Sequence, residues 1–530
     1  MKNILKYTMA SVVAMSLTNC TGDFEDINTN PYGISQESLT QQNNHIGSRF
    51  SPLFSNIIRV EPSWNYQLQQ NLNADVFSGY MTAPTDFAGN INNQTYALVN
   101  GWNGFIWSDA YDANDGNGIM PYAREIKEQV ELSGDPSGMK FVYLSNIVKV
   151  LGMQRISDVF GPIRYSKFDD YDTTGEYDSQ EEAYKAFFAD LDEAIAGLES
   201  DVDAVQFIPF DQSTLAGDIS KWRTFANSIR LRLAIRVSKV DPALAKIEGE
   251  KALSSPVGLM TTEDMKVDMN GFVHPIFTIS NSWGDILMSA EMESILKGFN
   301  DNRITKFFNA PADPTLGDYK GIRMGIELDT KAQYGSHSTV GEVVEGTHKT
   351  WMTAAEVLFL KAEAALRGWA GAGDAKSNYE AGVRASFAEL GASGVDAYLA
   401  DATSTPADFV DAKNPTNNYA YPSDVTIAYN DAGTNEEQLE QIITQKWIAM
   451  FPDGMEAWSE FRRTGYPRVF PVVINNSGGA IDTDIQIRRI NFVDVEKNTN
   501  GANVDAAIST LKGPDNGGTR LWWDTGAPNF

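Results

Sequence analysis

The sequence predicts a mainly α-helical protein, an α-solenoid of about four tetratricopeptide-like helix pairs with long segments inserted between them. Three observations support this fold class. Apolar residues recur at helical spacing in several segments, residues typical of helix starts precede those segments, and the helical segments come in pairs. The loops between the pairs have unequal lengths, so the pairing itself, and not a fixed repeat length, indicates the solenoid.

The first pair is predicted near residues 141–198. Its first helix has an apolar stripe at three-, four- and eight-residue steps, formed by Phe141, Leu144, Val148, Leu151 and Val159. Its second helix opens with Ser179 and Glu182, which have the spacing of a capping box.

Three further pairs are predicted near 220–253, 351–390 and 435–465. In the first of these, Asp241 caps a helix whose first turn holds Pro242. In the next, small residues such as Gly382 allow two helices to approach closely. In the last, Thr434 and Glu437 again have capping-box spacing.

Two long segments between the helices, 60–120 and 255–350, are predicted to be inserted loops that form a binding region. Both are rich in Gly, Asn, Pro and Asp. Connections of this length inside a compact domain are usually functional or folded onto the scaffold.

The N-terminus predicts a secreted, lipid-anchored protein. Two cations, Lys2 and Lys6, precede an apolar run that is too short to span a bilayer. The run ends in "LTNC", which resembles the lipobox of bacterial lipoproteins, and its Cys20 is the only cysteine of the chain. We therefore expect residues 1–19 to be a signal peptide and Cys20 to be acylated. The alternative is an unmodified buried thiol.

Beyond the anchor, we expect residues 20–40 to form a tether and residues 41–530 to form a single domain. Each buried CH₂ of an acyl chain contributes about 0.8 kcal/mol, so several chains on Cys20 would hold the protein at a membrane. A single cysteine also excludes a disulfide within the chain, and a packed core must stabilise the fold.

The charge of the chain argues against nucleic acid as a partner. The formal net charge is −28 at pH 7. A polyanion would be repelled, and the sequence has no stripe of Lys and Arg that could release counterions from phosphates.

Residues 60–123 contain no Lys or Arg but many aromatic and amide side chains. A neutral sugar offers an apolar face and a rim of hydroxyl groups, which flat rings and short amides complement. From this segment and from one loop between helices we select as candidate ligand-binding residues Trp64, Tyr80, Asp86, Trp102, Asn103, Trp107 and Trp283. The alternative for each aromatic residue is simple packing in the core.

Motifs of common enzymes are missing from the sequence. There is no Gly-x-Ser-x-Gly elbow, phosphate-binding loop or His-Glu-x-x-His pair, and "DANDGNG" at Asp112 departs from the EF-hand spacing. We therefore predict no catalytic residue, no metal and no cofactor. A glycosidase built on two carboxylates cannot be recognised by spacing, because its site is defined in space.

Several segments in order resemble the SusD/RagB family, and specifically its SusD-like lipoprotein branch. The matching segments run from the lipobox almost to the C-terminus: "INTNP", "SDVFGPIRYS", "YDSQEEAY", "FANSIRLRLAIRVS", "WMTAAEVLFLKAEAALRGW", "QKWIAMFPDGMEAWSEFRRTGYP" and "LWWD". The resemblance implies an outer-membrane lipoprotein, exposed at the cell surface, with four tetratricopeptide-like units and a binding region.

The resemblance also implies a function and a partner. Members of the family capture oligosaccharides and pass them to a SusC-like, TonB-dependent barrel, and some branches carry peptides instead. We expect the same of this chain. The remaining alternatives are a peptide receptor of the RagB type, a surface glycoside hydrolase and a structural surface protein.

Overall fold

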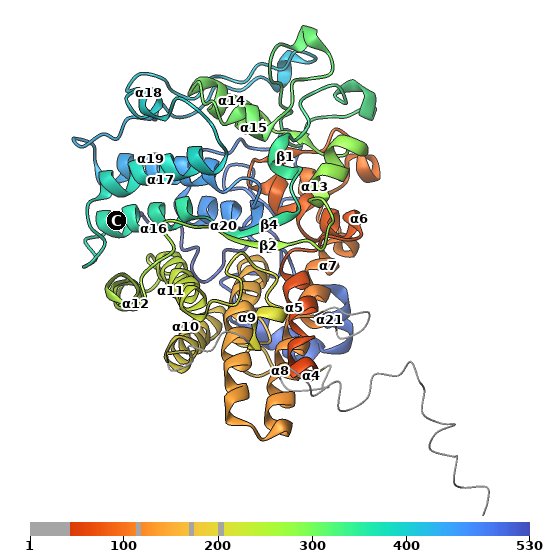
Figure 1. The fold of residues 1–530 in the computed structure, drawn as a ribbon. Coiled ribbons are helices and arrows are strands. Elements are labelled where there is room, and N and C mark those ends of the chain that lie inside the picture. Colours follow the sequence, from red (N-terminus) through yellow and green to blue (C-terminus); the bar gives the residue numbers. More distant parts are fainter. Residues whose placement is uncertain (1–42, 113–117, 169–173, 200–205) are drawn as a thin grey trace, which may run out of the picture.

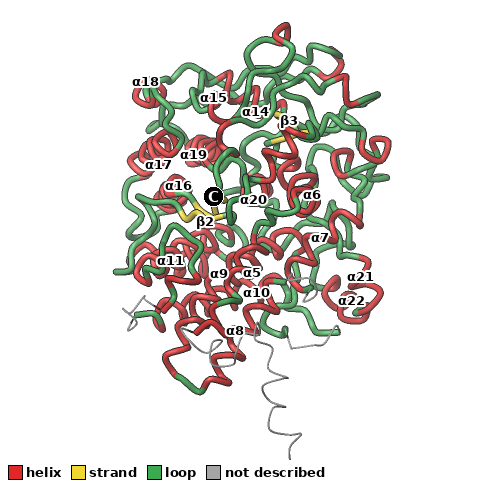
Figure 2. The backbone as a smooth tube through the Cα atoms, turned by 45° about the vertical axis from the view of Figure 1, so that its right-hand side comes forward, coloured by secondary structure: helices red, strands yellow, loops and turns green. Residues whose placement is uncertain are grey.

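The computed structural model describes residues 43–112, 118–168, 174–199 and 206–530. Within these ranges the protein is mainly helical and contains two small two-stranded sheets (Figures 1 and 2). The predicted fold class is therefore confirmed. The predicted signal peptide, the tether and Cys20 lie outside the described residues.

Eight helices form four consecutive pairs. They are α9 (Met139–Phe160) with α10 (Gln180–Gly197), α11 (Ile219–Arg236) with α12 (Pro242–Ser254), α16 (Ala354–Leu366) with α17 (Ala375–Glu389), and α19 (Asn435–Ala449) with α20 (Gly454–Thr464). Neighbouring pairs pack against each other in chain order, through α10 with α11, α11 with α16 and α16 with α19. Figure 1 shows this stack as a column on one side of the molecule.

Local sequence determines where several of these helices begin. The side chains of Ser179 and Thr434 accept hydrogen bonds from the third residue of α10 and α19, and a glutamate returns the bond in both capping boxes. Asp241 caps α12 in the same way, with a proline in the first turn. Gly382 permits the close approach of α17 to α16, since a Cβ there would lie 2.9 Å from the ring of Phe359.

The remaining elements pack around the solenoid, and α18 (Val395–Leu399) among them lies against α17. The other helices are α4 (Asn44–Gly47), α5 (Phe50–Ile57), α6 (Ser63–Tyr66), α7 (Asn100–Tyr111), α8 (Ile119–Ser133), α13 (Pro275–Phe277), α14 (Ala290–Gly298), α15 (Ile304–Phe307), α21 (Asp494–Thr499) and α22 (Gly501–Ser509). Strand β1 (Met81–Thr82) pairs antiparallel with β3 (Leu287–Met288), and β2 (Met265–Asp268) pairs antiparallel with β4 (His348–Met352).

The segment 60–120 differs from the predicted loop, because much of it is helical. Helix α6 continues into a π-helix, η2 (Gln67–Asp75), and α7 follows further along. Nearly every residue of η2 is buried, and its amides bond inside the fold. Asn73, for example, donates to the carbonyls of Leu68 and Gln69. Amide-rich sequence is typical of loops, but here the amides satisfy buried polar groups.

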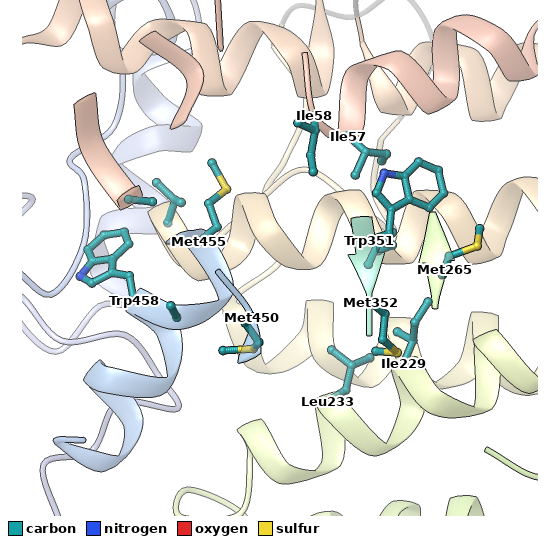
Figure 3. Packing of buried hydrophobic residues seen from close by; sticks show 14 of the residues in the cluster. Ile57, Ile58, Ile229, Leu233, Met265, Trp351, Met352, Met450, Met455 and Trp458 are labelled. Carbon is teal, nitrogen blue, oxygen red and sulfur yellow. The ribbon is translucent and has the colours of Figure 1, made fainter. Parts of the chain in front are cut away.

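One large hydrophobic core extends through the solenoid and the elements packed against it. Strand β4 contributes Trp351 and Met352, which lie between α5 and α11 (Figure 3). Ile57 approaches from α5, and Ile229 and Leu233 approach from α11. The strand thus fills the space between α5 and α11.

Charged residues are also buried, where the helix pairs meet. Arg232 and Arg236 of α11 pair with Glu356 of α16 and with Glu456 and Glu460 of α20. Burial disfavours each charge, but the surrounding arginines and Lys446 outweigh it and hold the pKa values of Glu456 and Glu460 below the ordinary range. These ion pairs connect three of the four helix pairs of the solenoid.

We predict that Arg236→Met lowers the free energy of unfolding by about 3–5 kcal/mol, because it removes one of the buried cations that offset the carboxylates of Asp158, Glu456 and Glu460. Urea denaturation at neutral pH measures the change. The matched control is Arg384→Met, which breaks the exposed ion pair with Asp396 and should cost less than about 1 kcal/mol.

The loss should depend on pH. Glu456 and Glu460 have lowered pKa values in the folded protein, so the stability that they contribute is present above their ordinary value of 4.5 and is lost as the pH falls through the folded values. The difference between wild type and Arg236→Met should therefore shrink below about pH 4.5. A difference that stays constant down to pH 3 would contradict this origin.

Candidate functional site

Exposed aromatic side chains gather around α6. Trp64 lies in α6 and is 47% exposed, and Trp283, at the end of the π-helix η9 (Thr278–Ser282), is 39% exposed. Phe272 is 47% exposed in the turn before α13. Helix α6 packs against both α13 and η9, so the segments that carry these three rings are neighbours. We call Trp64, Phe272 and Trp283 the aromatic face.

A carboxylate ties the segments of this face together. Asp285 accepts a hydrogen bond from Gln67, at 3.3 Å from its Nε2, and one from Thr85, at 3.4 Å from its Oγ1. Lys331 lies 2.5 Å from the same carboxylate and donates to the carbonyl oxygen of Trp283. Asp285 thus connects three segments: the helix that follows Trp64, the loop before Asp86 and the turn of Trp283.

Two rings of α7 pack against aromatic side chains of this region. Phe105 of α7 meets Trp64 edge to face, with ring centres 5.5 Å apart. Trp102, also of α7, meets Phe87 in the same geometry at 5.9 Å. Trp102 and Asp86 are half-buried. Such edge-to-face contacts hold the rings in place, and Trp64 remains 47% exposed.

Three of the selected candidates, Tyr80, Asn103 and Trp107, are buried in the core. Tyr80 is fully buried, donates its hydroxyl hydrogen to the carbonyl oxygen of Trp447 and packs on that ring. Trp107 is 3% exposed and sits against Tyr111, Phe160, Tyr177 and Phe492. Asn103 is buried and accepts a hydrogen bond from Asn93. Each side chain is used for packing, so none of them presents a surface to a ligand.

The structure therefore divides the seven candidates. Trp64, Asp86, Trp102 and Trp283 lie on or beside the aromatic face, and Tyr80, Asn103 and Trp107 do not. Sequence reasoning missed Phe272, Gln67 and Asp285. Phe272 and Val273 stand between Gly271 and the start of α13, and an apolar pair in a turn is a signal that could have been recognised.

Solenoid residues anchor the face. Arg155 of α9 lies 2.8 Å from the carboxylate of Asp453, which precedes α20, and also donates to Gln70 of η2 at 2.7 Å. Asp75, at the end of η2, accepts from the backbone of Gly454. Burial raises the pKa of Asp75 to about 6, although Asn71 and Gln70 stabilise its ionised form. The π-helix that continues from Trp64 is thus fixed to two helices of the solenoid.

A separate cavity of about 410 Å³ lies between the solenoid and the elements packed against it. Its walls include Trp351, Phe307, Met450 and Tyr66, together with buried His274, whose pKa is lowered to about 3 by its burial. None of the seven candidates lines it. We place the candidate site on the aromatic face instead, because a sugar stacks on an exposed flat ring.

The described residues contain neither a metal-binding cluster nor a membrane-spanning helix. In the ranges that the structure covers, no group of three or more His, Cys, Asp or Glu side chains could hold a metal ion. No described helix combines the length and the apolar character that crossing a bilayer requires. The geometry of the aromatic face supports binding through rings and hydrogen bonds.

Comparisons with known proteins identify the family. The SusD-like family model, described as "Susd and RagB outer membrane lipoprotein", matches residues 26–524, so the chain belongs to this family of outer-membrane lipoproteins. Comparison with curated protein sequences found no match.

Solved structures agree with this assignment over nearly the whole chain. A chitin-binding SusD homolog from Flavobacterium johnsoniae is 48% identical, with 92% of this chain and 100% of that chain covered and a TM-score of 0.88. A SusD homolog from Bacteroides vulgatus is 38% identical, with coverage of 92% and 99% and a TM-score of 0.85. A SusD-like protein from Bacteroides thetaiotaomicron is 34% identical, with coverage of 90% and 98% and a TM-score of 0.83.

The assignment of rings to face or core predicts a difference in stability. Trp107→Ala should lower the free energy of unfolding by about 3–5 kcal/mol, because it leaves a cavity in the core. Trp64→Ala should lower it by less than about 1 kcal/mol, because the ring is half exposed. Urea denaturation of both variants checks the assignment, and equal losses would contradict it.

Proposed function

We propose that the protein binds a neutral oligosaccharide on the aromatic face. The observation that carries this proposal is that Trp64, Phe272 and Trp283 are all exposed and lie on neighbouring segments. Apolar ring faces suit the C–H faces of sugars, and amides such as that of Gln67 suit their hydroxyl groups. Asp285 and Lys331, two charged residues near the face, form an ion pair at 2.5 Å.

Chitin oligosaccharide is the first ligand to test. The similar structure from Flavobacterium johnsoniae is described as that of a chitin-binding protein, and it is 48% identical to this chain. Chitin is an uncharged polymer whose acetamido groups add hydrogen-bonding sites. It therefore fits a face built from rings and amides.

The protein acts as a receptor and not as an enzyme in this proposal. An acylated Cys20 holds it at the outer membrane and exposes it at the cell surface, and it passes the captured glycan to a SusC-like, TonB-dependent barrel. Membership of a family of outer-membrane lipoproteins supports the anchor and the location. Affinity in the micromolar range, about −8 kcal/mol, would suit a ligand that must be released to a transporter.

Isothermal titration calorimetry with chitohexaose tests the site. We expect Trp64→Ala and Trp283→Ala each to weaken binding about tenfold or more, because a truncated stacking ring costs at least about 1.4 kcal/mol. Phe530→Ala is the matched control, since this ring is 49% exposed at the C-terminus and lies outside the aromatic face. Cellohexaose, maltohexaose and mixed peptides test the choice of ligand.

Two outcomes of that titration would contradict the proposal. One is binding of peptides without binding of any neutral glycan, which would favour a peptide receptor. The other is glycan binding that Trp64→Ala and Trp283→Ala leave as strong as in Phe530→Ala. Release of new reducing ends from the glycan would identify a hydrolase instead.

The partner has its own test. The full-length lipoprotein, carrying an affinity tag and extracted from its own outer membrane in a nonionic detergent, should retain a barrel of the TonB-dependent type. An unrelated outer-membrane lipoprotein treated in the same way is the control. Recovery without any barrel, at a detergent concentration that preserves other membrane complexes, would contradict the proposed delivery.

A further inference from the structure

A second cavity, of about 490 Å³, lies beside the end of α20. The loop after α20, the segment 484–488 and the C-terminal segment 526–529 form much of its wall. Six cationic side chains line it, and we call it the basic cavity: Lys239, Arg462, Arg463, Arg468, Arg488 and Arg520. Among the described residues of its lining, Asp484 is the one acid.

Carboxylates outside the lining compensate only part of this charge. Arg463 pairs with Glu363 and Glu460. Arg488 and Arg520, however, share the single carboxylate of Asp524, at 2.7 and 2.6 Å.

Arg462 has no carboxylate within ion-pair distance among the residues that the structure covers. It donates instead to the carbonyl oxygens of Asp158 and Arg488, at 2.6 and 2.9 Å. Since carbonyl oxygens carry no net charge, the charge of Arg462 adds to the excess.

Lys239 and Arg468 have side-chain hydrogen-bond donors that no acceptor of the described residues uses. The Nζ of Lys239 donates to the carbonyl oxygen of Arg463 at 2.8 Å, and Arg468 is exposed and lies over the ring of Tyr466, 4.7 Å from its centre. In the described part of the chain, neither has a carboxylate within ion-pair distance. An ammonium group has three donors and a guanidinium group five, so most of theirs remain free.

The electrostatics at Lys239 agree with an excess of positive charge. Burial, and next the nearby Arg463, lower the pKa of Lys239 to about 8, and Arg367 and Arg520 act in the same direction. Asp524 opposes them. The cavity is thus positive in a chain whose net charge is −28. Such a concentration of unpaired cations is costly unless an anion offsets it.

We propose that the basic cavity binds an oxyanion, meaning a carboxylate, sulfate or phosphate group, through Lys239, Arg468 and Arg520. A guanidinium fork matches two oxygens of such a group, and an ammonium adds a third charge-assisted hydrogen bond. No residue of the aromatic face lines this cavity, and Figures 1 and 2 show the C-terminus well separated from α6. The site is therefore distinct from the proposed site for a neutral glycan.

Titration calorimetry of the full-length protein in a nonionic detergent tests the proposal. The probes are sodium sulfate, sodium phosphate and D-glucuronate, at low ionic strength to limit screening, with D-glucose as the uncharged comparison. We expect saturable binding of one anion per chain and no heat of binding from glucose. Binding of all three anions would mean that the site recognises the oxyanion alone, and binding of glucuronate alone would mean that it recognises an acidic sugar.

Two variants locate the binding. Arg468→Gln removes an exposed side chain and Lys239→Met removes the half-buried amine, and each should weaken anion binding about tenfold or more. Arg384→Gln, at an exposed arginine of α17 outside the cavity, should leave it unchanged. Circular dichroism and chitohexaose titration verify that the variants are folded and that the aromatic face still works.

Two results would overturn the proposal. The first is the absence of saturable binding of sulfate, phosphate and glucuronate by the wild-type protein. The second is equal anion affinity in Arg468→Gln, Lys239→Met and Arg384→Gln. Neither result depends on whether a neutral glycan binds at Trp64 and Trp283, so this proposal and the proposed glycan site fail separately.

Discussion

Buried ion pairs between helices of different pairs are the constraint on which the rest of the structure depends. Arg236 of α11 meets Glu456 and Glu460 of α20, and Arg463 of α20 meets Glu363 of α16 at 2.6 Å. A buried charge that loses its partner is destabilising, so movements of the helices that separate these partners are disfavoured.

Polar contacts also connect the solenoid with the aromatic face. Arg155 connects α9 with Asp453 at the start of α20 and with Gln70 of η2. The π-helix continues directly from Trp64, and its Gln67 bonds to Asp285 beside Trp283. A series of hydrogen bonds therefore runs from the solenoid to the backbone segments that carry the exposed rings. A site whose backbone is already ordered loses less conformational entropy when a ligand binds.

Local patterns allowed much of the fold to be predicted. The capping boxes at Ser179 and Thr434 and the helical periodicity of α9 depend on residues within a few positions of each other, and the structure contains all of them. The segment 60–120 was misjudged, because Asn and Gln favour loops when they are exposed and here they satisfy buried backbone groups instead. Burial depends on the whole fold, so the local sequence does not predict it.

The site was harder to predict for the same reason. Tyr80 and Trp107 are aromatic residues with polar sequence neighbours, as Trp64 is. In the fold, however, Trp447 covers Tyr80, and Phe160 and Phe492 cover Trp107. These partners come from distant parts of the chain. Asp285, which joins the face, is 218 residues from Gln67. A single sequence suggests which residue types could bind a sugar, but the tertiary contacts decide which of them reach the surface.

A crystal structure of the protein with chitohexaose bound would test the proposed glycan site most directly. We expect sugar rings stacked on Trp64 and Trp283, with hydroxyl or acetamido groups near Gln67. Sugar bound only in the cavity between Trp351 and Met450, with both tryptophans free, would contradict the proposal.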